Sequence, residues 1–343
     1  MFTQFFTSNL DVVFMIYGLS FVIMAVSILI QPRKESIFIL SDILWILAGF
    51  GLTHGLNEWL DMFGIIAIKG GGKDSDLFNF VRLIVLAVSY LFLFEFGRRL
   101  LLLKIKKYLS GWFTLSLCFL TVTFMLVSSQ ERSIWARYFL GFPGALFSAV
   151  GFIYYYRDNK TILKPFKVRR FFLLAGVSLV VYSLLGGLVV PKAGFFPASI
   201  LNNTSFLKLI GIPVQVFRAI CAALLAWAVW NILGIFNWEI MYKLKSSQVQ
   251  INAVKTYVDN IVRSIGDCLI VVNPKAKIMA VNKATCELLG YEEEELITKP
   301  VQELLQEESP FTGARLEALA KDDYFKNCEL TCVSKMKIEI PVL

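Results

Sequence analysis

The composition of the chain changes at Trp238. The residues before it form a series of long apolar runs with basic turns, and the residues after it form a charged stretch followed by a mixed polar and apolar segment. Of the 343 residues, 57% are hydrophobic and only 17% are charged, which is unusual for a water-soluble domain of this length. This order predicts a membrane part followed by a soluble module, which is the layout of a receptor.

The apolar runs are long enough to cross a bilayer, since about 20 apolar residues span the hydrocarbon layer. The sequence therefore predicts an α-helical seven-transmembrane bundle over residues 1–236. The first positive charge is Arg33, so the first run lacks the basic start of a cleaved signal peptide and is expected to remain as a helix. The predicted spans are residues 10–30, 37–67, 77–96, 109–128, 134–156, 171–190 and 207–236.

Positive charge is concentrated in every second turn. The turns after the first, third and fifth spans hold thirteen Lys and Arg residues, more than twice as many as the opposite turns. Because basic turns stay in the cytoplasm, we expect an integral inner-membrane protein with its N-terminus outside and its C-terminal domain inside. The thirteen residues are Arg33, Lys34, Arg98, Arg99, Lys104, Lys106, Lys107, Arg157, Lys160, Lys164, Lys167, Arg169 and Arg170.

The charge balance differs between the two parts of the chain. Residues 1–236 carry 21 Lys and Arg against 10 Asp and Glu, whereas residues 237–343 carry 13 against 16. The net charge of +8 thus reflects membrane topology. A nucleic-acid-binding protein would carry its basic residues on the soluble part, so the expected surroundings are the lipid bilayer and no nucleic acid.

The six cysteines lie in predicted spans or in the soluble part, and none lies in an outer loop where oxidation would pair it. No CxxC spacing occurs, so the sequence supports neither a disulfide framework nor a zinc ribbon. Cys328 and Cys332 are four residues apart but have no second pair of ligands nearby. We therefore expect no metal site.

Residues 237–265 have a heptad pattern. Apolar side chains recur at steps of four and three, with one polar interruption at Ser247. This repeat predicts a coiled-coil signalling helix that joins two copies of the chain as a parallel homodimer. The alternative is an amphipathic helix that packs on its own domain. The pattern consists of Ile240, Leu244, Ser247, Ile251, Val254, Val258, Ile261 and Ile265.

The segment that follows is typical of a small α+β domain. Residues 268–282 predict a β-hairpin with a turn at 273–277, a short helix is expected to end at Gly290, and strands are expected at 327–334 and 338–343. Residues 266–343 resemble a PAS domain, with Thr298 standing where the family has a small residue. The resemblance is carried by Asp267–Val272, Val281–Ala284, Leu289–Tyr291, Glu294–Ile297 and Lys299–Pro300.

The PAS resemblance implies a five-stranded antiparallel sheet with helices on one face, used for dimerisation, signal relay or cofactor binding. Because the chain stops at Leu343, we expect this domain to be incomplete at its C-terminus. Residues 237–343 contain no histidine that could bind haem and no cysteine motif resembling that of photoactive flavin domains. A PAS domain that relays a signal without a cofactor is therefore favoured.

The second predicted span contains polar residues that are costly in a bilayer and normally face a bundle interior or a watery cavity. His54 is the only histidine, and three further polar residues follow it at i+3, i+4 and i+7, on the same helix face. Arginines at a similar depth in other spans predict an outer, mildly positive pocket for a small polar or anionic ligand. The predicted pocket residues are His54, Asn57, Glu58, Asp61, Arg82, Arg137, Gln215 and Arg218.

A purely structural role is the alternative for these residues. In that case Glu58 and Asp61 pair with Arg82 and tie the second span to the third, while His54 bonds to a neighbouring helix. Other ligand chemistries are not expected. The last span has no deep lysine for retinal, the chain has no second histidine for haem, and no cysteine lies one turn from His54 to bind copper.

The sequence thus predicts the sensory half of a signal transducer, similar to PAS-containing sensor histidine kinases and diguanylate cyclases. No histidine follows residue 54 and no ATP-binding glycine motif occurs, so we expect no enzymatic activity from this chain and an output domain that is missing from it. Two alternatives remain. One is a transporter or channel with a regulatory PAS domain, and the other is a quorum-type receptor for a hydrophobic ligand.

Overall fold

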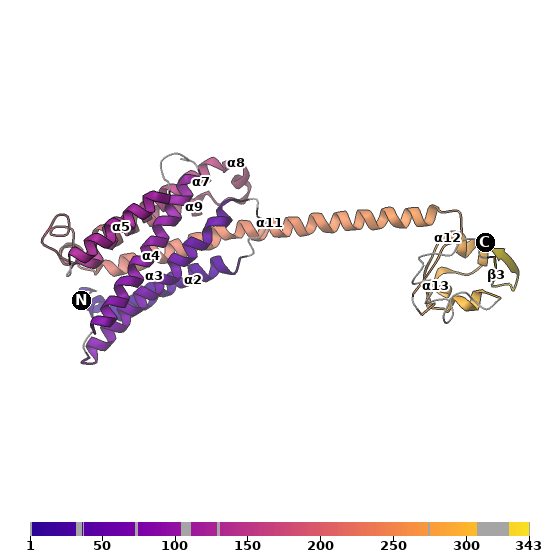
Figure 1. Ribbon diagram of the computed structural model, residues 1–343, viewed down its shortest axis with the longest axis horizontal. Helices are drawn as coiled ribbons and strands as arrows, with labels where there is room; N and C mark the ends of the chain where they lie inside the picture. The colour runs from indigo at the N-terminus through magenta and orange to yellow at the C-terminus, as the bar shows by residue number, and fades with distance from the viewer. Residues whose placement is uncertain are drawn as a thin grey trace. The chain divides into compact units, whose positions relative to one another are not determined.

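The computed structural model describes residues 2–31, 36, 38–72, 75–103, 111–128, 131–273, 275–306 and 329–342. The chain divides into two compact units, Met1–Tyr242 and Lys243–Leu343. The first unit is helical, and the second begins as a helix and continues as a mixed α and β domain (Figure 1).

The first unit is built from helices, the longer of which lie side by side (Figure 1). They are α1 (Phe2–Ser8), α2 (Leu10–Leu29), α3 (Leu40–Lys69), α4 (Asp76–Leu102), α5 (Gly111–Val127), α6 (Arg132–Ala136), α7 (Phe142–Asp158), α8 (Lys160–Leu163), α9 (Arg169–Tyr182), α10 (Asn203–Ile210) and the start of α11 (Val214–Ser264). α2 packs on α3, α3 on α4, α4 on α7, and α7 on α9. Helices suit an apolar medium because they pair their own backbone N–H and C=O groups.

Five helical segments among the described residues are long and apolar enough to cross a membrane, where the sequence predicts seven spans. The other two predicted spans correspond to α3 and α5. α3 has 30 residues, but the polar side chains of the predicted pocket lower its hydropathy, and α5 has only 17 residues. The five segments are residues 10–29, 76–102, 132–158, 169–188 and 214–264.

The seventh predicted span, residues 207–236, is not one helix. α10 is followed by Gly211, which has a φ of 78°, and α11 begins after Pro213. Glycine adopts this left-handed conformation without steric cost, and a proline disfavours helical geometry in the residue before it. A candidate span is thus present from Val214, and the predicted start at residue 207 was too early because the apolar run continues across a backbone break.

Two helices of the first unit contain a π-helical turn, in which N–H groups bond to the carbonyl group five residues back. η1 (Arg137–Gly141) lies between α6 and α7, and η3 (Ser183–Leu188) follows α9. Pro143 follows η1 and has no N–H group with which to continue the α-helical pattern. Such wide turns alter which carbonyl groups remain available to neighbouring side chains.

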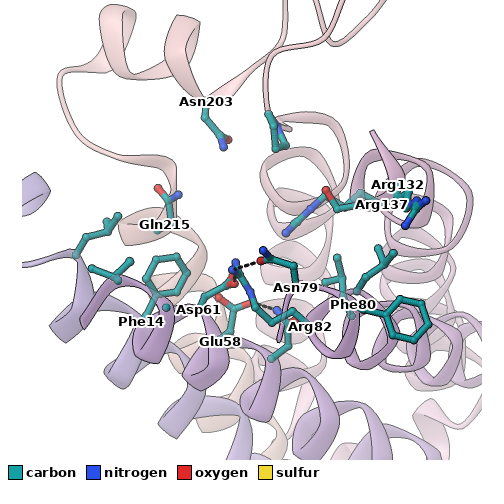
Figure 2. A pocket seen from close by; sticks show the side chains of 18 of the residues that line it. Phe14, Glu58, Asp61, Asn79, Phe80, Arg82, Arg132, Arg137, Asn203 and Gln215 are labelled. Atoms are coloured by element: carbon teal, nitrogen blue, oxygen red, sulfur yellow. Dashed lines mark hydrogen bonds and ion pairs between the residues drawn. The ribbon is translucent and has the colours of Figure 1, made fainter. Parts of the chain in front are cut away.

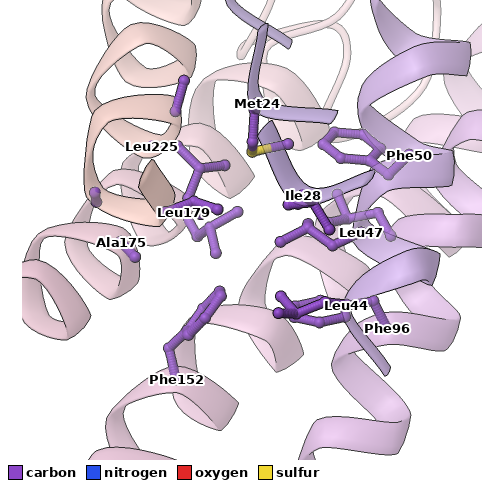
Figure 3. Close-up of a cluster of buried hydrophobic side chains, with 14 of the residues drawn as sticks. Met24, Ile28, Leu44, Leu47, Phe50, Phe96, Phe152, Ala175, Leu179 and Leu225 are labelled. Carbon is purple, nitrogen blue, oxygen red and sulfur yellow. The ribbon is translucent and has the colours of Figure 1, made fainter. Parts of the chain in front are cut away.

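Aromatic and aliphatic side chains form the core of the first unit. Residues of α2, α3, α4, α7, α9 and the start of α11 meet in one cluster (Figure 3). Met24, Leu47, Phe96, Phe152 and Leu179 have no exposed surface. Because lipid tails are as apolar as these side chains, close packing is what holds such helices together in a membrane. The cluster therefore positions the helices that carry the predicted pocket.

The predicted linker at 237–265 is helical, because α11 continues without a break to Ser264. Its heptad side chains Leu244, Ile251, Val254 and Val258 are exposed in the single chain. They are therefore not buried against any described part of their own chain. The coiled coil and the homodimer remain predictions.

The second unit contains the predicted strands as two antiparallel pairs. β1 (Ile270–Val272) pairs with β2 (Ile278–Val281), which confirms the hairpin. β3 (Leu330–Val333) pairs with β4 (Glu339–Val342), within the ranges expected for the later strands. The PAS resemblance implies five strands in one sheet, whereas the structure describes these four in two pairs.

Short helices follow the first strand pair. α12 (Lys283–Leu289) ends at Gly290, whose φ is 72°, as the sequence predicts. α13 (Glu293–Leu296) and the 3-10 helix η4 (Val301–Leu304) follow. Leu289, Leu296 and Leu304 are buried in a small core with β2. Several predicted features lie outside the described residues: Arg33, Lys34, Lys104, Lys106, Lys107, Cys328 and the start of the strand at 327–334.

Candidate functional site

A cavity of about 780 Å³ lies inside the first unit, lined by residues of α2, α3, α4, α6, η1, α10 and α11 (Figure 2). Seven of the eight predicted pocket residues line it. The structure thus brings together side chains from four predicted spans, although their role in binding a ligand remains a prediction. The seven are Asn57, Glu58, Asp61, Arg82, Arg137, Gln215 and Arg218.

His54 is the one predicted residue that does not line the cavity. Its Nδ1 lies 2.8 Å from Ser89 Oγ, and its Nε2 lies 2.7 Å from the Tyr182 hydroxyl. The Ser89 hydroxyl donates to the Leu86 carbonyl oxygen (2.7 Å), so His54 Nδ1 must carry the hydrogen that Ser89 accepts. Nε2 also lies 3.3 Å from Glu58 Oε1. His54 is therefore linked to the cavity by its contact with Glu58.

The two carboxylates of α3 have different partners. Asp61 forms an ion pair with Arg82 of α4, and Arg82 Nη1 also donates to Asn79 Oδ1 (3.2 Å). Glu58 instead accepts a hydrogen bond from Asn57 Nδ2 (3.2 Å) and has no arginine within ion-pair distance among the described residues. Asp61 thus makes the ion pair that the structural alternative predicts, whereas Glu58 does not, and both line the cavity.

Arg218 and Arg137 are held by main-chain carbonyl groups. Arg218 donates from Nε to the Leu185 oxygen (2.9 Å) and from Nη2 to the Val189 oxygen (2.5 Å). Arg137 Nη1 donates to the Gly186 oxygen (3.0 Å). These oxygens belong to η3 or follow it directly, and the last carbonyl groups of a helix lack partners within it. Both arginines thus cap a helix end, and neither forms an ion pair with a carboxylate in the described ranges.

Three buried side-chain atoms of residues that line the cavity have no hydrogen-bond partner within the part of the chain that the structure describes. They are Arg132 Nε, Arg137 Nε and Asn203 Oδ1. An unpaired buried polar group costs roughly 1–3 kcal/mol, so such groups favour a bound molecule that pairs with them. Sequence reasoning missed Arg132 and Asn203. Both stand at helix starts beyond the predicted spans, and only the folded connections bring them to the cavity.

The cavity combines charges of both signs with an excess of arginine. Figure 2 shows Gln215 on one side, Arg132 and Arg137 on the other, and the Arg82 contacts between them. An anion placed here can accept charge-assisted hydrogen bonds from guanidinium groups, while Glu58 and Asn203 can accept from a donor on the same molecule. The charged residues are Arg82, Arg132, Arg137, Arg218, Glu58, Asp61 and Asp76, the last of which the sequence did not single out.

In the second unit, the buried side chain of Asn282 joins several segments. Its Oδ1 accepts from the backbone N–H groups of Leu269 (3.0 Å) and Thr285 (3.1 Å). Its Nδ2 donates to the carbonyl oxygens of Ile265 (3.2 Å) and Asp267 (2.8 Å). One amide side chain thus caps α12 and ties it to the residues between α11 and β1.

A second cavity, of about 500 Å³, lies in this unit and is lined mostly by apolar side chains, with Cys268 and Cys332 among them. No group of three side chains able to hold a metal ion occurs among the described residues. The lining thus offers an apolar space with few polar groups to orient a ligand.

The second unit thus contains the β1–β2 hairpin, the helix cap by Asn282 and the helix end at Gly290. Residues 256–323 match the family of the PAS fold. This segment is a PAS domain. The match begins within α11, and its last residues, 307–323, lie outside the described residues. No curated protein and no solved structure matches the chain. The PAS domain therefore indicates a signalling or sensory role, and the helical unit carries no family name.

Proposed function

We propose that the chain is the sensory part of a membrane receptor that binds a small anionic molecule and passes the signal through α11 to the PAS domain. The supporting observation is the cavity, where the buried Nε atoms of Arg132 and Arg137 and the Oδ1 of Asn203 have no described partner. Polar groups that serve only stability are normally paired when buried. The guanidinium groups of the lining arginines suit an anion, and the amide oxygen of Asn203 suits a hydrogen-bond donor on the same molecule.

Arg218 supports the proposed signal path because it belongs to both the cavity and α11. Its hydrogen bonds hold α11 against η3, and the same helix continues to Ser264. An anion that binds Arg218 competes with the carbonyl groups of Leu185 and Val189. A ligand shifts a conformational equilibrium only by its differential affinity for the two states, and this competition supplies such a difference.

The proposed setting is the inner membrane, with seven spans, an external N-terminus and a homodimeric linker. α3 is included as a span because its polar residues face the cavity and need no contact with lipid. The proposal can be tested with single cysteines at exposed positions of opposite turns. Lys192→Cys should react with a membrane-impermeant thiol reagent in intact cells, and Thr161→Cys should not. The reverse labelling pattern would overturn the orientation.

The ligand can be sought by mass spectrometry of molecules that co-purify with the chain, followed by binding titrations with a panel of small carboxylates and phosphate. Arg132→Gln should weaken binding of the molecule so identified by about ten- to a hundredfold, since hydrogen bonds to charged groups contribute about 1.5–3 kcal/mol. The apo protein should keep its melting temperature, because Arg132 Nε has no described partner to lose.

Lys192→Gln is the matched control, because Lys192 is an exposed cation that does not line the cavity. The Lys192→Gln variant should bind the identified molecule with the same affinity as the wild type. The proposed function fails if no compound co-purifies and none of the panel binds, or if both variants bind as the wild type does.

A transporter is the second candidate, and the two π-helical turns favour it. η1 and η3 interrupt two helical segments of the bundle, and discontinuous helices line the sites of many transporters. Uptake of the identified molecule into liposomes would distinguish transport from sensing. The charged lining makes a purely hydrophobic quorum signal the weaker choice. As a receptor, the chain would depend on a separate kinase or cyclase domain for its output.

A further inference from the structure

A second concave surface lies at the turn between α7 and α9, away from the residues of the cavity. The stretch from Arg157 to Arg170 contains six Lys and Arg residues and one carboxylate. Two hollows, of about 240 and 600 Å³, share Tyr156, Lys160, Arg169 and Leu173. They therefore form one continuous depression, here called the basic groove.

The basic groove has an excess of positive charge, with six cations and the single carboxylate Asp158 in its stretch of chain. None of its six cations forms an ion pair with any residue in the described ranges, and all six side chains are exposed. α9 begins with Arg169 and Arg170, has no acidic residue in its first turn, and receives no side-chain cap from Val168. The N-terminus of a helix carries partial positive charge and free N–H groups, so two arginines there add repulsion unless an anion is bound.

The other wall of the basic groove is apolar. Ile153, Phe172 and Leu173 line its narrower part. From Leu173 an exposed apolar stripe continues along α9 and η3 through Val177, Val181 and Leu184, at steps of four, four and three that keep it on one helix face. In a bilayer such a stripe faces lipid. The groove is thus cationic at one end, and at the other it is continuous with the exposed apolar stripe that begins at Leu173.

We propose that the basic groove binds an anionic phospholipid, with its phosphate between Lys160 and Arg169 and an acyl chain along the stripe from Leu173. Basic pockets between spans bind anionic headgroups in membrane proteins generally. The alternative explanation is that these basic residues only set the membrane topology, and that explanation requires nothing more than charges in the turn. It requires neither a hollow with an apolar wall nor an uncapped helix that starts with two arginines.

The test is a binding titration of the full chain purified in detergent, followed by its melting temperature. The probes are a short-chain phosphatidylglycerol, a phosphatidylcholine with the same chains, glycerol phosphate and inorganic phosphate. We expect saturable stabilisation by phosphatidylglycerol at concentrations where the other three have little effect. Equal effects of both lipids, or of inorganic phosphate and phosphatidylglycerol, would overturn the proposal, the latter by showing a site for free phosphate.

Paired variants separate the groove from general surface charge. Lys160→Gln with Arg169→Gln should weaken phosphatidylglycerol binding about 25-fold, since each cation near an anionic headgroup is worth about fivefold. Lys192→Gln with Lys208→Gln removes two exposed charges elsewhere and should leave the affinity unchanged. Equal weakening by both pairs would refute a specific site.

A second pair of variants tests whether the apolar stripe holds an acyl chain. Both changes are made at exposed leucines, whose replacement should not disturb folding. Leu173→Gln should weaken lipid binding severalfold because it keeps every cation but interrupts the stripe. Leu209→Gln, at an exposed leucine of α10, is its control. If both leucine variants bind the lipid like the wild type, the stripe does not hold a chain and the proposal of a phospholipid is wrong.

Discussion

Arg218 in the helical unit and Asn282 in the PAS domain both tie separate backbone segments together with one buried side chain. The partners of Arg218 lie 29 and 33 residues away in the chain, whereas those of Asn282 lie only 3 to 17 residues away. The difference lies in sequence distance rather than in chemistry. A side chain with local partners leaves a short motif in the sequence, and one with distant partners leaves none.

The two residues should also differ in how much their loss lowers the unfolding free energy. Arg218 is a buried cation that bonds carbonyl groups at a charged cavity, while Asn282 is a buried neutral amide that bonds four backbone groups. The cost of losing either residue is set mainly by the partners left unpaired. The following substitutions test that comparison.

Arg218→Met should have the largest effect. It removes the cap of η3 and leaves the oxygens of Leu185 and Val189 without their donor, at a cost of about 3 kcal/mol of unfolding free energy. Denaturant unfolding of the chain in detergent, followed by tryptophan fluorescence, measures this. Lysine at this position keeps the charge but has one terminal nitrogen in place of the two that bond Leu185 and Val189. The unfolding free energy of Arg218→Lys should therefore lie between those of the wild type and the Met variant. A fully stable Met variant would show that the carbonyl bonds contribute little.

Asn282→Ala should cost the PAS domain roughly 2–3 kcal/mol, because four backbone groups lose one shared partner. Hydrogen exchange in the full chain should show faster exchange in β1 and α12 and no change in the helical unit. Asn260→Ala, at an exposed position of α11, is the control and should leave exchange unchanged. Slow exchange in both variants would mean that the domain does not depend on this cap.

Val254→Asp tests the linker, whose partner is predicted to be a second chain. If Val254 packs in a dimer seam, a charge there should raise the dimer dissociation constant by about thirtyfold, equivalent to about 2 kcal/mol. Light scattering over a dilution series measures it. Gln250→Asp places the same charge off the seam and should dimerise like the wild type. The coiled-coil prediction would be wrong if the wild type is monomeric, or if Val254→Asp and Gln250→Asp have the same dimer dissociation constant.

Thr298→Gly should have the smallest effect and the opposite sign. Thr298 has a φ of 72°, a conformation that strains a β-branched residue, and its side chain is exposed. Glycine should therefore raise the unfolding free energy by about 1 kcal/mol after its entropic cost. Gly290→Thr, at a φ of 72° in the same domain, should lower stability. Destabilisation by both changes would show that the Thr298 side chain matters more than its backbone.

Local patterns explain what could be predicted. The hairpin and the Gly290 helix end each depend on a few consecutive residues, so the sequence contains both the signal and its partners. Thr298 departs from the family at the position where the backbone adopts a positive φ, which shows why a small residue is usual there. The long apolar runs likewise predict where most of the long helices lie, although several ends differ, as for α4 and α11.

The cavity could be predicted only in part. The spacing within α3 identifies Asn57, Glu58 and Asp61, but spacing within a helix does not say which end faces a cavity, and His54 lies against Ser89 and Tyr182 instead. The π-helical turns have no periodicity of their own. Arg132 and Asn203 reach the cavity through connections whose paths depend on the packed bundle, so hydropathy could not identify them.

The burial of His54 has a practical consequence. As the only histidine of the chain, it would give a single pair of ring-nitrogen resonances in a sample labelled with ¹⁵N-histidine, with no assignment needed. The protonation pattern of that ring is set by Ser89, Tyr182 and Glu58, and the Glu58 carboxylate lines the cavity. A change in the charge occupying the cavity would therefore be seen at one spectroscopic reporter that the protein already contains.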